Sequence, residues 1–180
     1  MSVAVIVIFV LFCLINFYII YKLAKRNDKQ KKKAALNCFV LFSIFFIAKW
    51  IFGWMIPDYS LFLVMVALFV NNFFGYYKNK YNHSKNFDRI LHGYGSFSFA
   101  LLGYYFIVLI TQQDMSRFFR AIFIFVLGVA LGALFELLEF SIDSKYHTET
   151  QKSLKDTDTD MLCNAIGSLI AAIVSCFIIP

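Results

Sequence analysis

The sequence predicts an all-α membrane protein: a bundle of six transmembrane helices that forms a single membrane domain over residues 1–180. Hydrophobic residues make up 61% of the chain, whereas a soluble domain of this size needs more polar surface to cover its core. Several apolar runs reach the roughly 20 residues that a helix needs to cross a bilayer. None of them alternates between apolar and polar residues as the strands of a membrane barrel do, so we expect helices.

Six apolar runs are candidates for the spans, and polar stretches separate them. They cover about residues 3–21, 34–56, 60–77, 87–111, 118–140 and 160–180. The first run lacks the basic start of a signal peptide, so we expect it to remain as a spanning helix. The later runs are bounded by a lysine-rich stretch, by PDYS, by KNKYNHSKN, by QQDMSR and by a long polar segment that begins SIDSKY.

Basic residues gather on one side of these spans. Seven of the twelve residues from Lys22 to Lys33 are basic, and the segments after the third and fifth spans add more, whereas the other side has only Arg117 and Arg120. The positive-inside rule then places the basic segments in the cytoplasm and both termini outside. We attribute the net charge of +6 to topology and to contact between Lys22 to Lys33 and anionic lipid headgroups, not to nucleic acid binding.

Four cysteines and one lysine lie within the apolar runs, and we expect none of them to take part in a reaction. The cysteines are expected to pack inside the protein and the lysine to anchor its helix at the membrane interface. The cysteines have no paired spacing, so we interpret them as small buried residues and not as disulfide partners or zinc ligands: Cys13, Cys38, Cys163 and Cys176. Lys49 lies beside Trp50 and near Trp54, a combination typical of the membrane interface. We therefore expect the Lys49 side chain to extend toward the outer headgroups.

Ionisable side chains lie at one end of three predicted spans. Asp88 and His92 open the fourth span, Glu136 and Glu139 close the fifth, and Asp160 opens the sixth. Consecutive spans alternate in direction, so these ends lie at the same membrane level whichever way the chain is inserted. A charge near the bilayer centre costs about 2.5–3.5 kcal/mol, and two close glutamates also repel each other. They need partners, a shared proton or a cation.

Small residues continue the same helix faces, because residues three, four or seven apart lie on one side of a helix. These residues are Gly95, Ser96 and Gly103, then Gly128 and Gly132, and then Asn164, Gly167 and Ser168. Such strips let helices approach closely in a membrane. We therefore expect spans four, five and six to converge on one intramembrane site that opens to the cytoplasm.

The residues of this predicted site differ in their expected roles. The candidate catalytic residues are Asp88, His92, Glu136, Glu139, Asp156 and Asp160, and the candidate metal ligands among them are His92, Glu136, Glu139 and Asp160. Histidine with carboxylates suits manganese, iron or zinc, so a divalent metal ion is a candidate cofactor, and the sequence does not identify the cofactor itself. The residues expected to support them are Arg89, Asp143 and Asn164.

The segment KDTDTDMLCNAIGSL, residues 155–169, raises the alternative of a calcium loop. An EF-hand loop that begins at Asp156, with Asp158 and Asp160 as its next ligands, needs glycine at its sixth position and glutamate at its twelfth. Met161 and Gly167 stand at those positions, so this alternative fails.

We expect Asp160 instead to be the N-cap or a first-turn residue of the sixth span. Asn164 lies on the same face one turn later, so both side chains should point toward His92 and the glutamates. The prediction is that a carboxylate oxygen of Asp160 lies within about 8 Å of a side-chain atom of His92 or Glu139, which leaves room for one bridging water or ion. Asp158 should point elsewhere.

The same positions carry a resemblance to a known family. The stretches DRILH, FELLEF and TQ followed by DTDTDMLCNAIG resemble the YjdF-like family of bacterial inner-membrane proteins, in which Asp-Arg-x-x-His, Glu-x-x-Glu-Trp and a terminal Asp-x-x-x-Asp-Met segment recur in this order. The matching positions are Asp88, Arg89, His92, Glu136, Glu139, Asp156, Asp160 and Met161. The chain is also distantly similar to VanZ-like proteins, which are linked to glycopeptide tolerance.

The resemblance covers about residues 87–179, and the earlier spans match only in hydropathy. The chain departs from the family pattern at Phe140, where a tryptophan is frequent, and at Ser153 and Lys155, where an acid and an aromatic residue are expected. The resemblance implies a multi-pass protein of the bacterial inner membrane whose polar residues belong together. It implies no activity.

Three functions remain open. The first is a membrane enzyme whose divalent metal activates water or polarises a phosphoryl oxygen of a lipid or lipid-linked substrate. The second is a proton- or ion-coupled transporter, which with six spans and no visible inverted repeat would act as a homo-oligomer. The third is a structural or regulatory protein in which the polar residues only fix helix packing. Metal content separates the first from the third, and flux in proteoliposomes tests the second.

Overall fold

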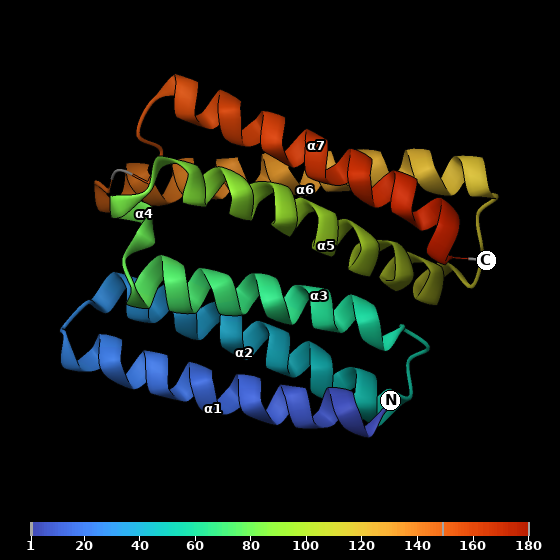
Figure 1. Cartoon of the computed structure of the whole chain (residues 1–180), viewed down its shortest axis with the longest axis horizontal. Coiled ribbons are helices and arrows are strands. Elements are labelled where there is room, and N and C mark those ends of the chain that lie inside the picture. Colours follow the sequence, from blue (N-terminus) through green and yellow to red (C-terminus); the bar gives the residue numbers. More distant parts are fainter. Residues whose placement is uncertain (1, 149, 180) are drawn as a thin grey trace. The chain divides into compact units, whose positions relative to one another are not determined.

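The computed structural model describes residues 2–148 and 150–179, and this part of the chain contains six helices long and apolar enough to cross a membrane (Figure 1). The predicted fold class is therefore confirmed. The helices fall into two compact units, Met1–Phe87 and Asp88–Pro180, and each is described by itself. That the whole chain forms one membrane domain stays a prediction.

The first unit contains three spans and one short helix. Its elements are α1 (Val3–Lys25), α2 (Lys29–Phe52), α3 (Asp58–Phe69), η1 (Val70–Tyr77) and α4 (Lys80–His83). η1 is a π-helical continuation of α3, and the two together form the third span. Ser2 and Asp28 cap α1 and α2 by accepting backbone N–H groups of the first turns, as serine and aspartate commonly do.

Buried polar contacts connect the spans of the first unit. Asn72 on η1 donates a hydrogen bond of 2.7 Å from Nδ2 to Asn16 Oδ1 on α1, and both side chains are fully buried. Lys49 on α2 is only 5% exposed, and its ammonium lies 3.3 Å from Asp58 Oδ1 at the start of α3. The prediction that Lys49 extends to the headgroups is wrong, because Asp58 provides a partner within the unit.

The second unit contains α5 (Lys85–Thr111), α6 (Arg117–Tyr146) and α7 (Leu154–Ile178), which lie side by side (Figure 1). Glycines allow the close approach that the small-residue faces predict. Gly132 on α6 packs against Asn164, and Gly167 on α7 lies against the backbone carbonyl of Gly93 on α5. A Cβ atom added at Gly167 would collide with that carbonyl oxygen.

Two helices of this unit extend beyond their predicted spans at the end that carries the ionisable residues. α7 begins at Leu154 and not near residue 160, and Ser153 caps it by accepting from the Asp156 N–H at 3.2 Å. α6 continues to Tyr146 and not only to about residue 140. Its 30 residues measure about 45 Å, more than the hydrocarbon core of roughly 30 Å, and hydropathy marks only the apolar part. Asp160 therefore lies in the second turn of α7 and is not its cap.

Candidate metal centre

The three helices of the second unit bring ionisable side chains to one place. Asp88 and His92 lie one turn apart on α5, Glu136 and Glu139 one turn apart on α6, and Asp160 on the second turn of α7. Residues at these spacings share a helix face. Close glycine contacts between the helices then bring the three faces together. The convergence predicted from the sequence is present in the structure.

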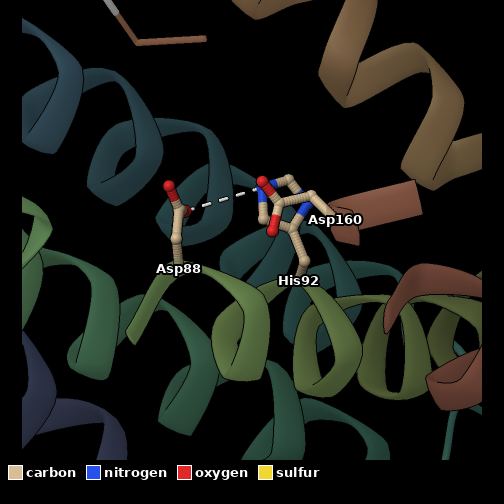
Figure 2. Close-up of side chains that lie close together, drawn as sticks. All are labelled: Asp88, His92 and Asp160. Carbon is tan, nitrogen blue, oxygen red and sulfur yellow. Dashed lines mark ion pairs between the residues drawn. The ribbon is translucent and has the colours of Figure 1, made fainter. Parts of the chain in front are cut away.

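His92 meets two aspartates. Its Nε2 lies 3.6 Å from Asp88 Oδ1, and one potential ligand atom from each of Asp88, His92 and Asp160 lies within 4.8 Å of the other two. Figure 2 shows the Asp88 and His92 side chains rising from the same helix, with the Asp160 carboxylate beside the imidazole ring. The predicted proximity of Asp160 and His92 is confirmed. Asp88 and Asp160 are 6% and 4% exposed, and the His92 side chain is 9% exposed.

The same imidazole meets the two glutamates. His92 Nε2 lies 3.7 Å from Glu136 Oε1, and ligand atoms of His92, Glu136 and Glu139 lie within 4.8 Å of one another. Glu136 is buried and Glu139 is half-buried. His92 is thus common to two groups of side chains, each of which could hold a metal ion.

Two carboxylate oxygens of the site have no hydrogen-bond partner. Glu136 Oε1 and Asp160 Oδ1 are both buried, and neither accepts a hydrogen bond from the described part of the protein. An unpaired buried acceptor costs about 1–3 kcal/mol, and more when it is ionised. Carboxylate oxygens beside an imidazole are ligands that divalent transition metals take. The residues present therefore fit a metal ion.

Between α6 and α7 lies a connecting segment, of which the structure describes residues 147, 148 and 150–153. Two of these residues contact the outer oxygens of two of the carboxylates. Gln151 Nε2 donates a hydrogen bond of 2.9 Å to Glu136 Oε2, and Lys152 Nζ lies 3.7 Å from Asp88 Oδ2. The other oxygen of each carboxylate faces His92 Nε2. Glu136 and Asp88 therefore each divide their two oxygens between the connecting segment and the imidazole.

The predicted residues Arg89 and Asp156 lie at the rim of the site. Arg89 Nη2 is 3.6 Å from Asp156 Oδ1, and Lys152 Nζ is 3.9 Å from Asp156 Oδ2. Asp156 thus faces two cationic side chains and belongs to neither group around His92. Asp158 is exposed on α7, as predicted.

Asn164 and Asp143 contact neighbours of the site. Asn164 Oδ1 accepts a hydrogen bond of 2.7 Å from Ser96 Oγ on α5, so its amide joins α7 to α5 one turn deeper than Asp160. We predicted that it points at the glutamates, but on α6 it faces Gly132, because the missing side chain there leaves room for the amide. Asp143 accepts hydrogen bonds from the connecting segment and organises it.

Gln151 and Lys152 are site residues that sequence reasoning missed. They lie in a polar stretch without helical periodicity, so spacing offers no reason to place them near Glu136 or Asp88. The one available signal is their position directly before the helix that carries Asp156 and Asp160.

Comparison with known proteins places the chain among membrane proteins. No solved structure matches it. An uncharacterized protein of Thermotoga maritima is 32% identical over 118 residues, which are 62% of this chain and 59% of that protein, so the match spans less than two thirds of the relative. The family described as Predicted membrane protein (DUF2238) matches residues 3–179, in agreement with the YjdF-like resemblance, whereas the VanZ-like similarity stays a prediction. The chain therefore belongs to the DUF2238 family of membrane proteins.

Proposed function

We propose that this protein is a divalent-metal-dependent membrane enzyme that acts on a lipid or lipid-linked substrate. The observation that carries the proposal is the presence of two buried carboxylate oxygens that accept no hydrogen bond, on side chains that meet one imidazole. The ligands would come from His92, Glu136, Glu139 and Asp160, with Asp88 beside them.

The spacing of the potential ligand atoms supports a metal ion. Three atoms at the corners of a triangle with sides of 3.6–4.8 Å lie about 2.1–2.8 Å from its centre, close to the metal–ligand distances of about 2.0–2.6 Å seen in proteins. A contraction of roughly half an ångström per ligand would complete the coordination. One histidine with several carboxylates suits manganese, iron or zinc better than calcium, which takes oxygen ligands only.

The charges around the site also favour a cation. Five carboxylates lie in or beside it: Asp88, Glu136, Glu139, Asp156 and Asp160. Two cationic side chains, Lys152 and Arg89, pair with members of this set. If all of them are ionised, three negative charges remain in excess, and unpaired charges are costly in a bilayer. A divalent ion neutralises two of these charges and reduces the repulsion between the glutamates.

The depth of the site supports a lipid substrate. Asp160 lies six residues from the start of α7 and Glu136 ten residues from the end of α6, which correspond to about 9 and 15 Å along the helices. Because α6 is longer than the hydrocarbon core, its last turns reach the headgroup region. The site therefore lies near the boundary between headgroups and acyl chains, where the ester and phosphate bonds of lipids are found. The positive-inside rule assigns this boundary to the cytoplasmic leaflet of the bacterial inner membrane.

These positions suit hydrolysis or group transfer at a lipid headgroup. A bound divalent ion would polarise a phosphoryl or carbonyl oxygen and activate water. Asp88 would accept a proton, because its carboxylate lies beside the candidate ligands His92 and Asp160. No side chain of the described site has the surroundings of an activated serine or cysteine nucleophile, so water is the expected attacking group.

Elemental analysis of the purified full-length protein tests the metal site. After exposure to manganese, iron and zinc and removal of free ions, the wild type should retain about one equivalent of metal, and Glu136→Gln should lose it because an amide is a poorer ligand. Asp114→Asn, which neutralises an exposed acid between α5 and α6, is the matched control and should retain the metal. Equal metal content in wild type and Glu136→Gln would contradict the proposal.

A proton-coupled transporter is the second candidate, because the titratable side chains form a continuous line. Lys152, Asp88, His92 and Glu136 follow one another at 3.6–3.7 Å. Chains of acids and histidines move protons in membrane transporters. Proton flux in proteoliposomes that disappears in His92→Ala, together with an absence of bound metal, would favour transport over the enzyme.

A further inference from the structure

We propose that Gln151 and Asp143 are positioning residues that orient Glu136 as a metal ligand. This inference rests on the metal site proposed above and extends it to the connecting segment, which sequence spacing did not link to the site.

Gln151 holds Glu136 at two points. Its Nε2 donates hydrogen bonds of 2.9 Å to the backbone oxygen of Glu136 and to Oε2 of the same residue. With both acceptors on one residue, the amide fixes the carboxylate relative to the axis of α6. Oε2 is thereby occupied, and Oε1, which has no hydrogen-bond partner, is the oxygen that faces His92 at 3.7 Å. Groups that hydrogen-bond a ligand from behind set its orientation and its affinity for the metal.

Asp143 holds the backbone from which Gln151 reaches Glu136. Its Oδ2 accepts from the Gln151 N–H at 2.9 Å, and its Oδ1 accepts from Thr150 N–H at 2.9 Å and from the Thr150 hydroxyl at 2.7 Å. The Thr148 hydroxyl donates to the same Oδ1. Asp143 lies seven residues after Glu136, hence on the same face of α6 two turns later. Asp143 therefore fixes the backbone at Thr150 and Gln151, from which the Gln151 side chain reaches Glu136.

Lys152 acts differently from its neighbour Gln151. Its ammonium is 3.7 Å from Asp88 Oδ2, beyond hydrogen-bond distance, and its side chain is 42% exposed. A loosely held, hydrated charge balances Asp88 but does not fix the angle of its carboxylate. Positioning through the connecting segment thus falls to Gln151, whose hydrogen bonds are short and directional.

A purely structural role for these contacts makes a different prediction. If they only tie the end of α6 to the start of α7, breaking them should lower the stability of the fold and leave metal affinity unchanged in the molecules that stay folded. A positioning role requires weaker and geometrically altered metal binding in the molecules that stay folded.

The test uses full-length protein in detergent and the metal alone as the probe. Gln151→Met keeps the length of the side chain and removes its donor. We expect its Mn²⁺ dissociation constant to rise about 10–100-fold and its Co²⁺ absorption spectrum to change, because a misdirected ligand alters both affinity and coordination geometry. The variant should stay folded, with an unfolding temperature lowered only by the loss of these hydrogen bonds. Gln113→Met, in the exposed link between α5 and α6, is the control and should match the wild type in every measurement.

A second variant tests whether Asp143 acts through Gln151. Asp143→Ala should weaken Mn²⁺ binding by a similar factor, and the double variant should be no worse than the weaker-binding single variant, because both changes remove the same positioning. If the wild type binds Mn²⁺ and Gln151→Met binds it equally well, or loses binding only by unfolding, the positioning role is wrong and the metal site stands. If the wild type binds no metal, the proposed function itself fails.

Discussion

Replacing Gly167 by alanine tests the close helix contact on which the site depends. Gly167 on α7 lies against Gly93 on α5, and a Cβ at Gly167 would collide with the Gly93 carbonyl oxygen and lie 2.7 Å from the carbonyl carbon. Both atoms belong to the backbone, so no side chain can rotate away, and α5 and α7 must separate instead. Overpacking of this kind costs about 1–3 kcal/mol.

Gly95→Ala is the matched control for this substitution. Gly95 lies on α5, two residues after Gly93, and a Cβ added at Gly95 meets no atom within 4 Å. Both variants gain the same preference of alanine over glycine in a helix, roughly 0.5–1 kcal/mol, so the difference between them isolates the collision. We expect Gly95→Ala to be at least as stable as the wild type, and Gly167→Ala to be about 1–3 kcal/mol less stable than Gly95→Ala.

Thermal unfolding in detergent, followed with a thiol-reactive fluorescent dye, measures this difference. The dye reports unfolding because Cys13, Cys38, Cys163 and Cys176 are free, half-buried thiols, and two of them, Cys163 and Cys176, lie on α7. Metal affinity should also fall in Gly167→Ala only, since separating α5 from α7 moves His92 away from Asp160. Equal unfolding temperatures and equal metal affinities in the two glycine variants would refute the reasoning.

Two further predictions concern charged residues at and near the site. Asp160→Asn should lower metal affinity at least about 10-fold, because its buried carboxylate lies beside the imidazole. Asp158→Asn should leave the affinity unchanged, because Asp158 is exposed. Calorimetric titration measures both affinities, and equal losses would contradict the placement of Asp160. Lys152→Met should strengthen divalent-metal binding roughly fivefold, because a screened positive charge near Asp88 disappears. The control Lys155→Met, at an exposed position, should leave the binding unchanged. Calorimetric titration measures both, and weaker binding in Lys152→Met would refute the electrostatic role.

The arrangement of the site could be predicted from the sequence because it follows from local rules. Apolar runs of about 20 residues define the spans, and consecutive spans alternate in direction, which puts the acidic ends at one level. Spacings of three, four and seven residues then define the faces, so Asp88 and His92 come together with Glu136 and Glu139. The glycines Gly128, Gly132 and Gly167 indicate which sides of α6 and α7 meet other helices. On α5 the prediction is wrong for Gly95, beside which a Cβ would meet no atom within 4 Å, and Gly93 makes the contact with α7 instead.

The contacts from outside this periodic pattern could not be predicted. Gln151 reaches Glu136 because Asp143 fixes an irregular segment, and no spacing rule describes the path of such a segment. The early start of α7 depends on the Ser153 cap and lies outside the apolar run. Lys49 suggests a headgroup anchor when its own span is considered alone, and only the packing of α3 against α2 shows its partner.

The two units contain buried polar clusters of different kinds, and the difference bears on function. In the first unit, Asn72 donates to Asn16, and Asn16 donates from Nδ2 to the Phe12 backbone oxygen at 2.8 Å, so each amide has a partner across or along the helices. A network that only fixes helix packing should be satisfied in this way, because every unpaired buried group costs stability without improving the packing. The cluster around the imidazole of the second unit leaves one oxygen of Glu136 and one of Asp160 without hydrogen-bond partners, and the Glu136 oxygen lies 3.7 Å from His92 Nε2. Packing alone does not account for two carboxylate oxygens without hydrogen bonds beside one histidine, whereas the proposed metal site would use both as ligands.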